Sequence, residues 1–136
     1  MNQSFKVRDY MTSTFTAVGP EMEIMELVSL MVEKDIAGAV VVDQSGRLRG
    51  VITERDCIAV ATSAGYFDER GGKVEDFMSA QVETLGAEEN LMDVAQRMSD
   101  SPHRAFPVID DDMNVVGLLS RREVLKALTS GAWFKA

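Results

Sequence analysis

Two seven-residue stretches of this sequence share one pattern, and that pattern decides how the rest of the chain is interpreted. The first is Gly50-Val51-Ile52-Thr53-Glu54-Arg55-Asp56, and the second is Gly117-Leu118-Leu119-Ser120-Arg121-Arg122-Glu123. Each begins with glycine and two apolar residues, then places a hydroxyl residue three positions before a carboxylate. A hydroxyl residue followed at this distance by a carboxylate is the capping-box pattern of a helix N-terminus. Each stretch therefore predicts a strand that leads directly into a helix.

The two stretches lie 67 residues apart, and the same offset relates most of the chain. Residues 7–58 align with residues 74–125 without a gap, and eleven of the 52 pairs are identical. The identical pairs are Val7/Val74, Asp9/Asp76, Met11/Met78, Gly19/Gly86, Glu21/Glu88, Met25/Met92, Met31/Met98, Val41/Val108, Asp43/Asp110, Gly50/Gly117 and Arg55/Arg122. The chain is therefore an internal duplication, and we place the repeats at residues 1–66 and 67–136.

Each repeat predicts a short helical entry, a short strand, an amphipathic helix, an antiparallel hairpin and a closing helix. The helical spacing i, i+3, i+4, i+7 appears at Ile24, Leu27, Val28 and Met31, and again at Leu91, Val94, Ala95 and Met98. Gly19-Pro20 is expected to open the first of these helices. The hairpin strands are expected at 39–43 and 48–53 and at 106–110 and 115–120, and the closing helices at 54 to about 64 and 121 to about 130.

The fold class that follows is α/β, with two small sheets. A unit of roughly 60 residues buries too little of its surface to be stable alone. We therefore expect the two sheets to pack on each other with pseudo-twofold symmetry, which creates two equivalent clefts.

Composition excludes several classes of protein. With 14 Lys and Arg against 22 Asp and Glu, the net charge is −8, which argues against binding to nucleic acid. One cysteine and one histidine are too few for an intramolecular disulfide or a zinc cluster. No apolar run has the length of a signal peptide core or a membrane span. We therefore expect a cytoplasmic protein without a metal site, and the lone His103 leaves no catalytic triad to assign.

The two junctions support two interpretations. In the first, the carboxylate and hydroxyl only cap the helix. In the second, the helix N-terminus also attracts a phosphate, and the two carboxylate oxygens accept the hydroxyls of a ribose diol. The two are compatible, because a ligand would lie outside the first turn.

Taken together, these motifs resemble the CBS-domain pair, or Bateman module, of the stand-alone bacterial type. The resemblance rests on the duplication, the two junctions, the motifs Met11-Thr12 and Met78-Ser79, and the strands Ala-Val-Val-Val-Asp (39–43) and Phe-Pro-Val-Ile-Asp (106–110). It covers almost the whole chain. It implies a regulatory, signal-transducing module without enzyme activity that binds AMP, ADP or ATP between the repeats, with S-adenosylmethionine or NAD as further possible ligands. It also implies a homodimer.

The resemblance also implies the site residues, because each cleft in this family combines the junction of one repeat with segments preceding the strands of the other. The first cleft would contain Thr53, Arg55, Asp56, Gln81, Val82, His103, Arg104 and Ala105. The second would contain Thr14, Phe15, Ile36, Ala37, Gly38, Ser120, Arg121, Arg122 and Glu123. We expect the first to bind better, because Asp56 matches the family pattern and Arg104 and His103 would meet phosphate charge.

A structural or dimerisation module that binds no nucleotide remains the alternative. Its junctions would be helix caps only, and its partner would bind a methionine-rich or C-terminal surface. The tail Ala132-Trp133-Phe134-Lys135 is expected either to fold back on its own repeat or to join a dimer contact.

Overall fold

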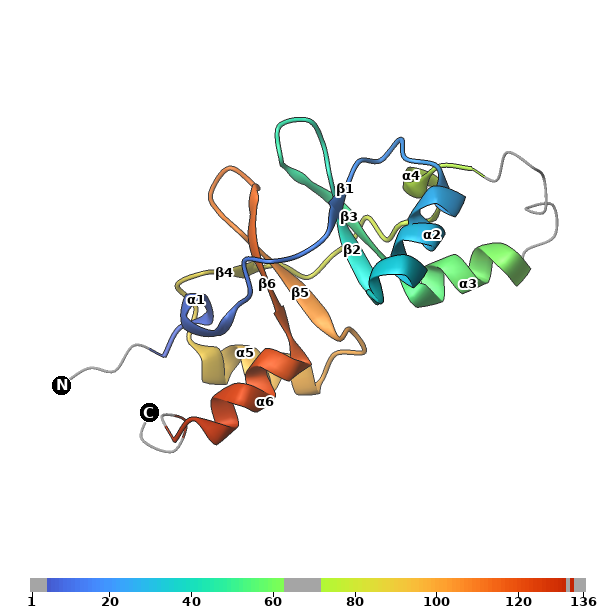
Figure 1. Cartoon of the computed structure of the whole chain (residues 1–136). Coiled ribbons are helices and arrows are strands. Elements are labelled where there is room, and N and C mark those ends of the chain that lie inside the picture. The colour runs from blue at the N-terminus through green and yellow to red at the C-terminus, as the bar shows by residue number, and fades with distance from the viewer. Residues whose placement is uncertain (1–4, 63–71, 132, 134–136) are drawn as a thin grey trace. The chain divides into compact units, whose positions relative to one another are not determined.

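The computed structural model describes residues 5–62, 72–131 and 133, and these residues form two compact units (Figure 1). Unit 1 consists of Met1–Phe15 together with Glu83–Ala136, and unit 2 consists of Thr16–Val82. The expected packing of the two sheets on each other stays a prediction. The repeat boundary proposed at 66/67 falls in segment 63–71, outside the described residues.

The predicted elements follow one another along the chain in the predicted order, and each unit has one three-stranded sheet. Unit 2 contains β1 (Ala17–Val18), α2 (Ile24–Lys34), β2 (Gly38–Val42), β3 (Leu48–Thr53), α3 (Glu54–Thr62) and α4 (Val74–Phe77). Unit 1 contains α1 (Val7–Tyr10), β4 (Leu85–Gly86), α5 (Leu91–Ser99), β5 (Ala105–Ile109), β6 (Val115–Ser120) and α6 (Arg121–Thr129). The sheet orders are β1-β2-β3 and β4-β5-β6, with the first pair of strands parallel and the second antiparallel. These mixed sheets confirm the α/β class.

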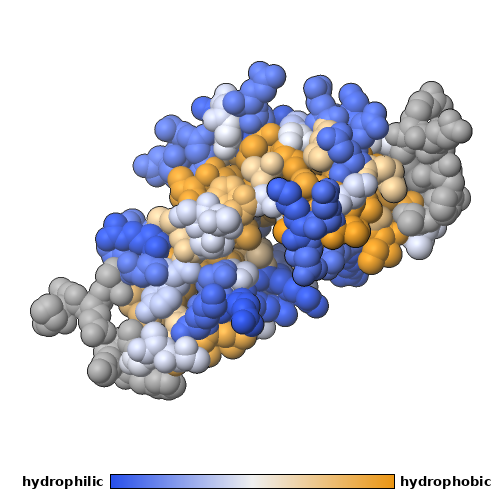
Figure 2. All heavy atoms as spheres, in the orientation of Figure 1, coloured by the Kyte–Doolittle hydropathy of each residue, from blue (hydrophilic) through white to orange (hydrophobic). Residues whose placement is uncertain are grey.

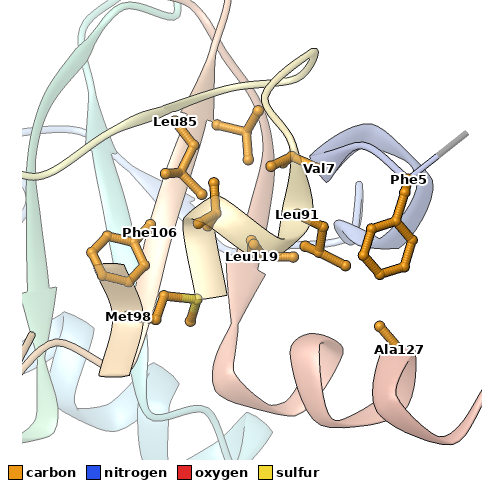
Figure 3. Close-up of a cluster of buried hydrophobic side chains, with 10 residues drawn as sticks. Phe5, Val7, Leu85, Leu91, Met98, Phe106, Leu119 and Ala127 are labelled. Atoms are coloured by element: carbon orange, nitrogen blue, oxygen red, sulfur yellow. The ribbon is translucent and has the colours of Figure 1, made fainter. Parts of the chain in front are cut away.

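The core of each unit is formed by the apolar face of its amphipathic helix packed against its sheet. In unit 1, Leu91, Val94 and Met98 of α5 are buried with Phe106 and Leu119 of the sheet (Figure 3). In unit 2, the corresponding helix α2 buries Ile24, Leu27 and Met31 against Val41 and Ile52. The helical periodicity of the sequence therefore identified the buried face correctly.

The first strand of each hairpin begins and ends one residue earlier than predicted, whereas the second strand has the predicted bounds. The first strand ends early because its aspartate belongs to the turn. Asp43 Oδ1 accepts hydrogen bonds from the amides of Ser45 (2.9 Å) and Arg47 (3.0 Å). Asp110 Oδ1 likewise accepts from the amides of Asp112 and Asn114, both at 2.9 Å. An aspartate that bonds to the backbone beyond it closes a turn instead of continuing a strand.

The expectation that Gly19-Pro20 opens the first amphipathic helix is wrong. Helix α2 begins at Ile24, with Glu23 as its N-cap. The carbonyl of Pro20 instead accepts a hydrogen bond from the amide of Glu75 (2.9 Å). Gly19-Pro20 thus precedes a loop that receives α4.

The short helical entries are exchanged between the repeats. Helix α1 comes from the first repeat but lies in unit 1, where the Val7 amide donates to the Glu89 carbonyl (3.0 Å). Helix α4 comes from the second repeat but lies in unit 2, where the Val74 amide donates to the Met22 carbonyl (2.8 Å). The partners of the two bonds are related by the same 67-residue offset, so the exchange is reciprocal.

The glycine that begins each junction allows this exchange. A Cβ on Gly50 would lie 2.5 Å from the carbonyl oxygen of Ser79, and one on Gly117 would lie 2.5 Å from the sulfur of Met11. Backbone hydrogen bonds join Ser79 to Val51 and Thr12 to Leu118 at these points. The Met-Thr and Met-Ser motifs therefore cross β6 and β3 where only a glycine leaves room.

The C-terminal tail folds back on unit 1 at Trp133, the one tail residue that the structure describes. The Trp133 ring meets Phe5 edge to face at a centroid distance of 5.4 Å, and Phe5 meets Tyr10 at 5.8 Å. The expectations for Ala132, Phe134 and Lys135 fall outside the described residues.

Candidate functional site

The first junction joins β3 to α3 through a complete capping box. Asp56 Oδ2 accepts hydrogen bonds from the amide of Thr53 (2.9 Å) and from its hydroxyl (3.1 Å). The Asp56 amide in turn donates to Thr53 Oγ1 (3.3 Å). The carboxylate is therefore held in a fixed orientation over the first turn of the helix.

The second junction joins β6 to α6 in the same way. Glu123 Oε1 accepts a hydrogen bond from the amide of Ser120 (2.7 Å) and another from the Ser120 hydroxyl. The extra methylene of Glu123 therefore still allows the cap to form. In the described part of the chain, neither Asp56 Oδ1 nor Glu123 Oε2 receives a hydrogen bond, so one oxygen of each carboxylate keeps its acceptor capacity.

The capping geometry limits what the junctions offer to a ligand. The hydroxyls of Thr53 and Ser120 already donate to the carboxylates. The first amide of each helix is also occupied, because Glu54 donates to the Ala37 carbonyl and Arg121 to the Arg104 carbonyl, both at 2.9 Å. Each junction still offers a ligand the carboxylate oxygen that takes no part in the cap.

The segment preceding each second strand lies beside the junction of its own repeat. Gly38 pairs with Thr53 across β2 and β3, and Ala105 pairs with Ser120 across β5 and β6. The guanidinium of Arg121 also donates to the Ser101 carbonyl (3.3 Å). The hairpin register thus places the start of β2 beside the end of β3, and the start of β5 beside the end of β6.

Eight of the expected site residues lie in unit 2 and nine in unit 1. Unit 2 holds Ile36, Ala37, Gly38, Thr53, Arg55, Asp56, Gln81 and Val82, whereas unit 1 holds Thr14, Phe15, His103, Arg104, Ala105, Ser120, Arg121, Arg122 and Glu123. The pairing of Asp56 with His103 and Arg104 would take residues from both units, so it stays a prediction.

The basic side chains expected to meet phosphate are exposed. His103, Arg104, Arg121 and Arg122 are all solvent-accessible, and the His103 ring lies edge-on to Phe106 at 6.4 Å. An exposed guanidinium can move toward an anion with little desolvation.

Cys57, which sequence reasoning left without a role, lies directly after Asp56. Burial raises the pKa of its thiol, and the negative charges of Asp56 and Glu54 raise that pKa further. The thiol is therefore neutral near pH 7 and adds no charge to the junction.

The described residues lack both a metal-binding cluster and a membrane-spanning helix. They contain no group of three His, Cys, Asp or Glu side chains arranged to hold a metal ion. They also contain no helix with the length and hydrophobicity needed to cross a membrane.

Known proteins are similar to this chain in sequence, and solved structures are similar to it in fold. The CBS domain-containing protein YhcV of Bacillus subtilis is 33% identical over 114 residues, which is 84% of this chain and 79% of YhcV. CBSX2, solved in complex with AMP, is 27% identical with a TM-score of 0.85, covering 94% of this chain and 98% of that chain. The cytosolic domain of the Mg²⁺ channel MgtE, solved in complex with ATP, is 25% identical with a TM-score of 0.77, covering 92% of this chain and 49% of that chain.

The family model of the CBS domain matches this sequence twice, over residues 7–63 and 74–130. The two matches fall on the two halves of the duplication and together contain both capped junctions. The chain therefore belongs to the CBS domain family and carries two CBS domains in tandem.

Proposed function

We propose that this chain is a non-catalytic regulatory module that binds an adenosine-containing nucleotide between its two CBS domains. The observation that carries the proposal is the capped junction, where Asp56 Oδ2 is fixed by Thr53 while Oδ1 remains available. A carboxylate held by its own helix loses little conformational entropy when a ligand binds. Its available oxygen has two acceptor positions, which suit the two hydroxyls of a ribose.

Two relatives support the ligand class. CBSX2 is described in complex with AMP and the MgtE cytosolic domain in complex with ATP, and both share the fold of this chain. The common part of these ligands is adenosine with at least one phosphate. AMP, ADP and ATP are therefore the first candidates here, followed by NAD and S-adenosylmethionine.

The two sites would differ in affinity. In the first, we propose that Asp56 grips the ribose while His103 and Arg104 of the other repeat meet the phosphate. In the second, Glu123 takes the place of Asp56, and Arg121 replaces the Glu54 of the first junction. A ligand can regulate only by binding one arrangement of the chain better than another, so the site with the better geometry would dominate the response.

The expected homodimer belongs to the same proposal. Apolar side chains reach the surface at equivalent helix positions of the two units, with Ile58 65% exposed and Leu125 58% exposed. Met25 and Met92 form a second equivalent pair, at 56% and 40%. Figure 2 shows apolar residues at the surface among the charged ones. Because exposed apolar residues recur at equivalent positions of both units, we propose that they belong to one contact surface. Two copies of the chain would pair through this surface in the cytoplasm.

A thermal-shift panel tests nucleotide binding directly. The purified chain is melted with AMP, ADP, ATP, NAD or S-adenosylmethionine, and with GTP as a purine control. A ligand at a hundred times its dissociation constant adds about 2.7 kcal/mol to the free energy of unfolding, which raises the melting temperature by several degrees. We expect this shift with at least one adenosine ligand and a smaller one with GTP.

A second function is favoured by one observation, namely that both junction hydroxyls are used in capping. In that case the chain is a structural or dimerisation module without a nucleotide. The absence of a shift with every compound of the panel would support this function and reject the first.

A further inference from the structure

A carboxylate is hydrogen-bonded to the loop that carries the phosphate-binding residues proposed above. Glu83 Oε1 accepts a hydrogen bond from the hydroxyl of Ser101 (3.1 Å), and Ser101 Oγ accepts one from the amide of His103 (3.2 Å). The guanidinium of Arg121 donates to the carbonyl of the same serine (3.3 Å). These four residues all belong to unit 1. A negative charge of the chain itself therefore lies beside residues that would attract a phosphate.

This contact between Glu83 and Ser101 occurs in the second repeat alone. The 67-residue offset places Thr16 at the position of Glu83, and Lys34 at the position of Ser101. The first repeat thus lacks both the carboxylate and the hydroxyl that holds it. Its sheet and its helices have the same order and nearly the same lengths without them. The fold of a repeat therefore does not require the contact.

The hydrogen bond fixes the charge of Glu83 where a phosphate would bind. Glu83, His103 and Arg104 are all exposed, so each side chain has room to move in solvent. A free glutamate would turn away from an approaching anion, whereas Glu83 is held at the loop by Ser101. A phosphate at this loop would thus be attracted by the guanidinium of Arg104 and repelled by the fixed carboxylate.

We propose that Glu83 is a specificity-determining residue, which biases the nucleotide site against ligands with long phosphate chains. The inference rests on the proposed function and specifies which of the adenosine ligands the site favours. Coulomb energy is proportional to the charge of the ligand. AMP carries about two negative charges at pH 7 and ATP about four, so the repulsion from Glu83 is greater for ATP.

Isothermal titration of AMP and ATP into the wild-type chain and into Glu83→Gln tests the proposal. Glutamine keeps an acceptor for the Ser101 hydroxyl and removes the charge, so the loop keeps its hydrogen bond. Magnesium is left out so that ATP retains its full charge. We expect Glu83→Gln to bind AMP about threefold more tightly and ATP about ninefold more tightly, because doubling the ligand charge squares the factor.

Two further variants separate the fixed charge from other effects. Asp111→Asn removes a negative charge from the exposed turn between β5 and β6, at the opposite end of the hairpin from Ala105. It should bind both nucleotides like the wild-type chain. Ser101→Ala keeps the charge of Glu83 but releases the side chain, and we expect a gain in ATP affinity that is smaller than that of Glu83→Gln.

The outcomes distinguish this proposal from the proposed function. A merely structural hydrogen bond would change the affinities for AMP and ATP by the same factor. Equal changes in Glu83→Gln, or none, would therefore overturn the role of Glu83 and leave nucleotide binding intact. A Ser101→Ala chain with the wild-type affinity for ATP would overturn the claim that the hydrogen bond fixes the charge. A wild-type chain that binds neither nucleotide would overturn both proposals.

Discussion

Replacing the junction glycines with alanine should destabilise the chain, because these positions admit the exchanged N-terminal segments. A Cβ at residue 50 would meet the backbone oxygen of Ser79 at 2.5 Å and the sulfur of Met78 at 2.9 Å. The backbone can withdraw only by stretching the hydrogen bonds between Val51 and Ser79, which are 3.0 and 2.9 Å long. Overpacking costs about 1–3 kcal/mol, and each strained hydrogen bond adds about 1 kcal/mol. Gly50→Ala should therefore lower the free energy of unfolding by about 3–5 kcal/mol.

Gly117→Ala should cost less, about 1–3 kcal/mol, because the nearest atom is in a flexible side chain. The Cβ would lie 2.5 Å from the sulfur of Met11, which can rotate away, and 3.1 Å from the carbonyl oxygen of Thr12. Shortening Met11 to alanine in the Gly117→Ala chain should recover part of the loss. If the lost stability came only from the different backbone freedom of glycine and alanine, shortening Met11 would recover none of it.

Guanidinium chloride unfolding followed by circular dichroism measures both variants. The fluorescence of Trp133 adds a probe inside unit 1, where Gly117 lies. Gly19→Ala is the matched control, because no atom lies within 4 Å of a Cβ built there. If Gly50→Ala and Gly117→Ala were as stable as Gly19→Ala, the close crossing of the exchanged segments would be refuted.

Three further predictions concern single residues. Hydrogen bonds from the turn amides, with Asn114 the largest contributor, lower the pKa of Asp110. The ionised carboxylate therefore stabilises the fold above its ordinary pKa, and this stability is lost as the pH falls through the lowered pKa. Asp110→Asn should make the melting temperature fall less steeply below about pH 4, while Asp111→Asn should leave that fall unchanged. Trp133→Ala should lower the free energy of unfolding by about 1–3 kcal/mol and Trp133→Phe by less, in denaturant titrations followed by circular dichroism, because an edge-to-face ring pair is lost only in the first. Burial raises the pKa of Cys57, so iodoacetamide at pH 8 should alkylate it more slowly in the folded chain than in guanidinium chloride, and equal rates would contradict this.

The helices and strands could be predicted because apolar spacing and capping patterns depend on residues close together in the sequence, and the repeat shows each pattern twice. Apolar spacing placed α2 and α5 correctly, and the capping-box pattern placed the starts of α3 and α6 at Glu54 and Arg121. The misplaced helix start at Gly19-Pro20 shows where local reasoning failed. A glycine-proline pair is a good local start signal, but here the segment is held by a hydrogen bond from Glu75, far along the chain.

The exchange of α1 and α4 between units could not be predicted from local patterns. The Met-Thr and Met-Ser motifs were visible, but nothing in their own residues shows that Met11 lies on Gly117 instead of on Gly50. Two duplicated halves offer identical partners, so the choice depends on the connections and not on the motif. A constant offset within the sequence can reveal a repeat without showing which short helical entry packs in which unit.

The candidate site was predicted in its residue types but not in its hydrogen bonding. The sequence indicated that Thr53 and Asp56 suit both capping and ribose binding, and the structure shows that capping occupies the hydroxyl and one oxygen. Whether Arg104 meets the same ligand depends on the placement of one unit against the other, which no local pattern encodes.

Isothermal titration of AMP and ATP into the wild-type chain and into Asp56→Asn tests the central claim most directly. Asparagine keeps an acceptor for the Thr53 cap but removes the charge, so the fold is retained while a charge-assisted contact worth about 1.5–3 kcal/mol is lost. We expect binding to the wild-type chain. Since about 1.4 kcal/mol corresponds to a factor of ten, the dissociation constant for Asp56→Asn should be tenfold to hundredfold larger. Asp76→Asn, which alters the equivalent cap of α4, should bind like the wild type. A wild-type chain that gives no binding heat, or an Asp56→Asn chain that binds as tightly as the wild type, would contradict the account.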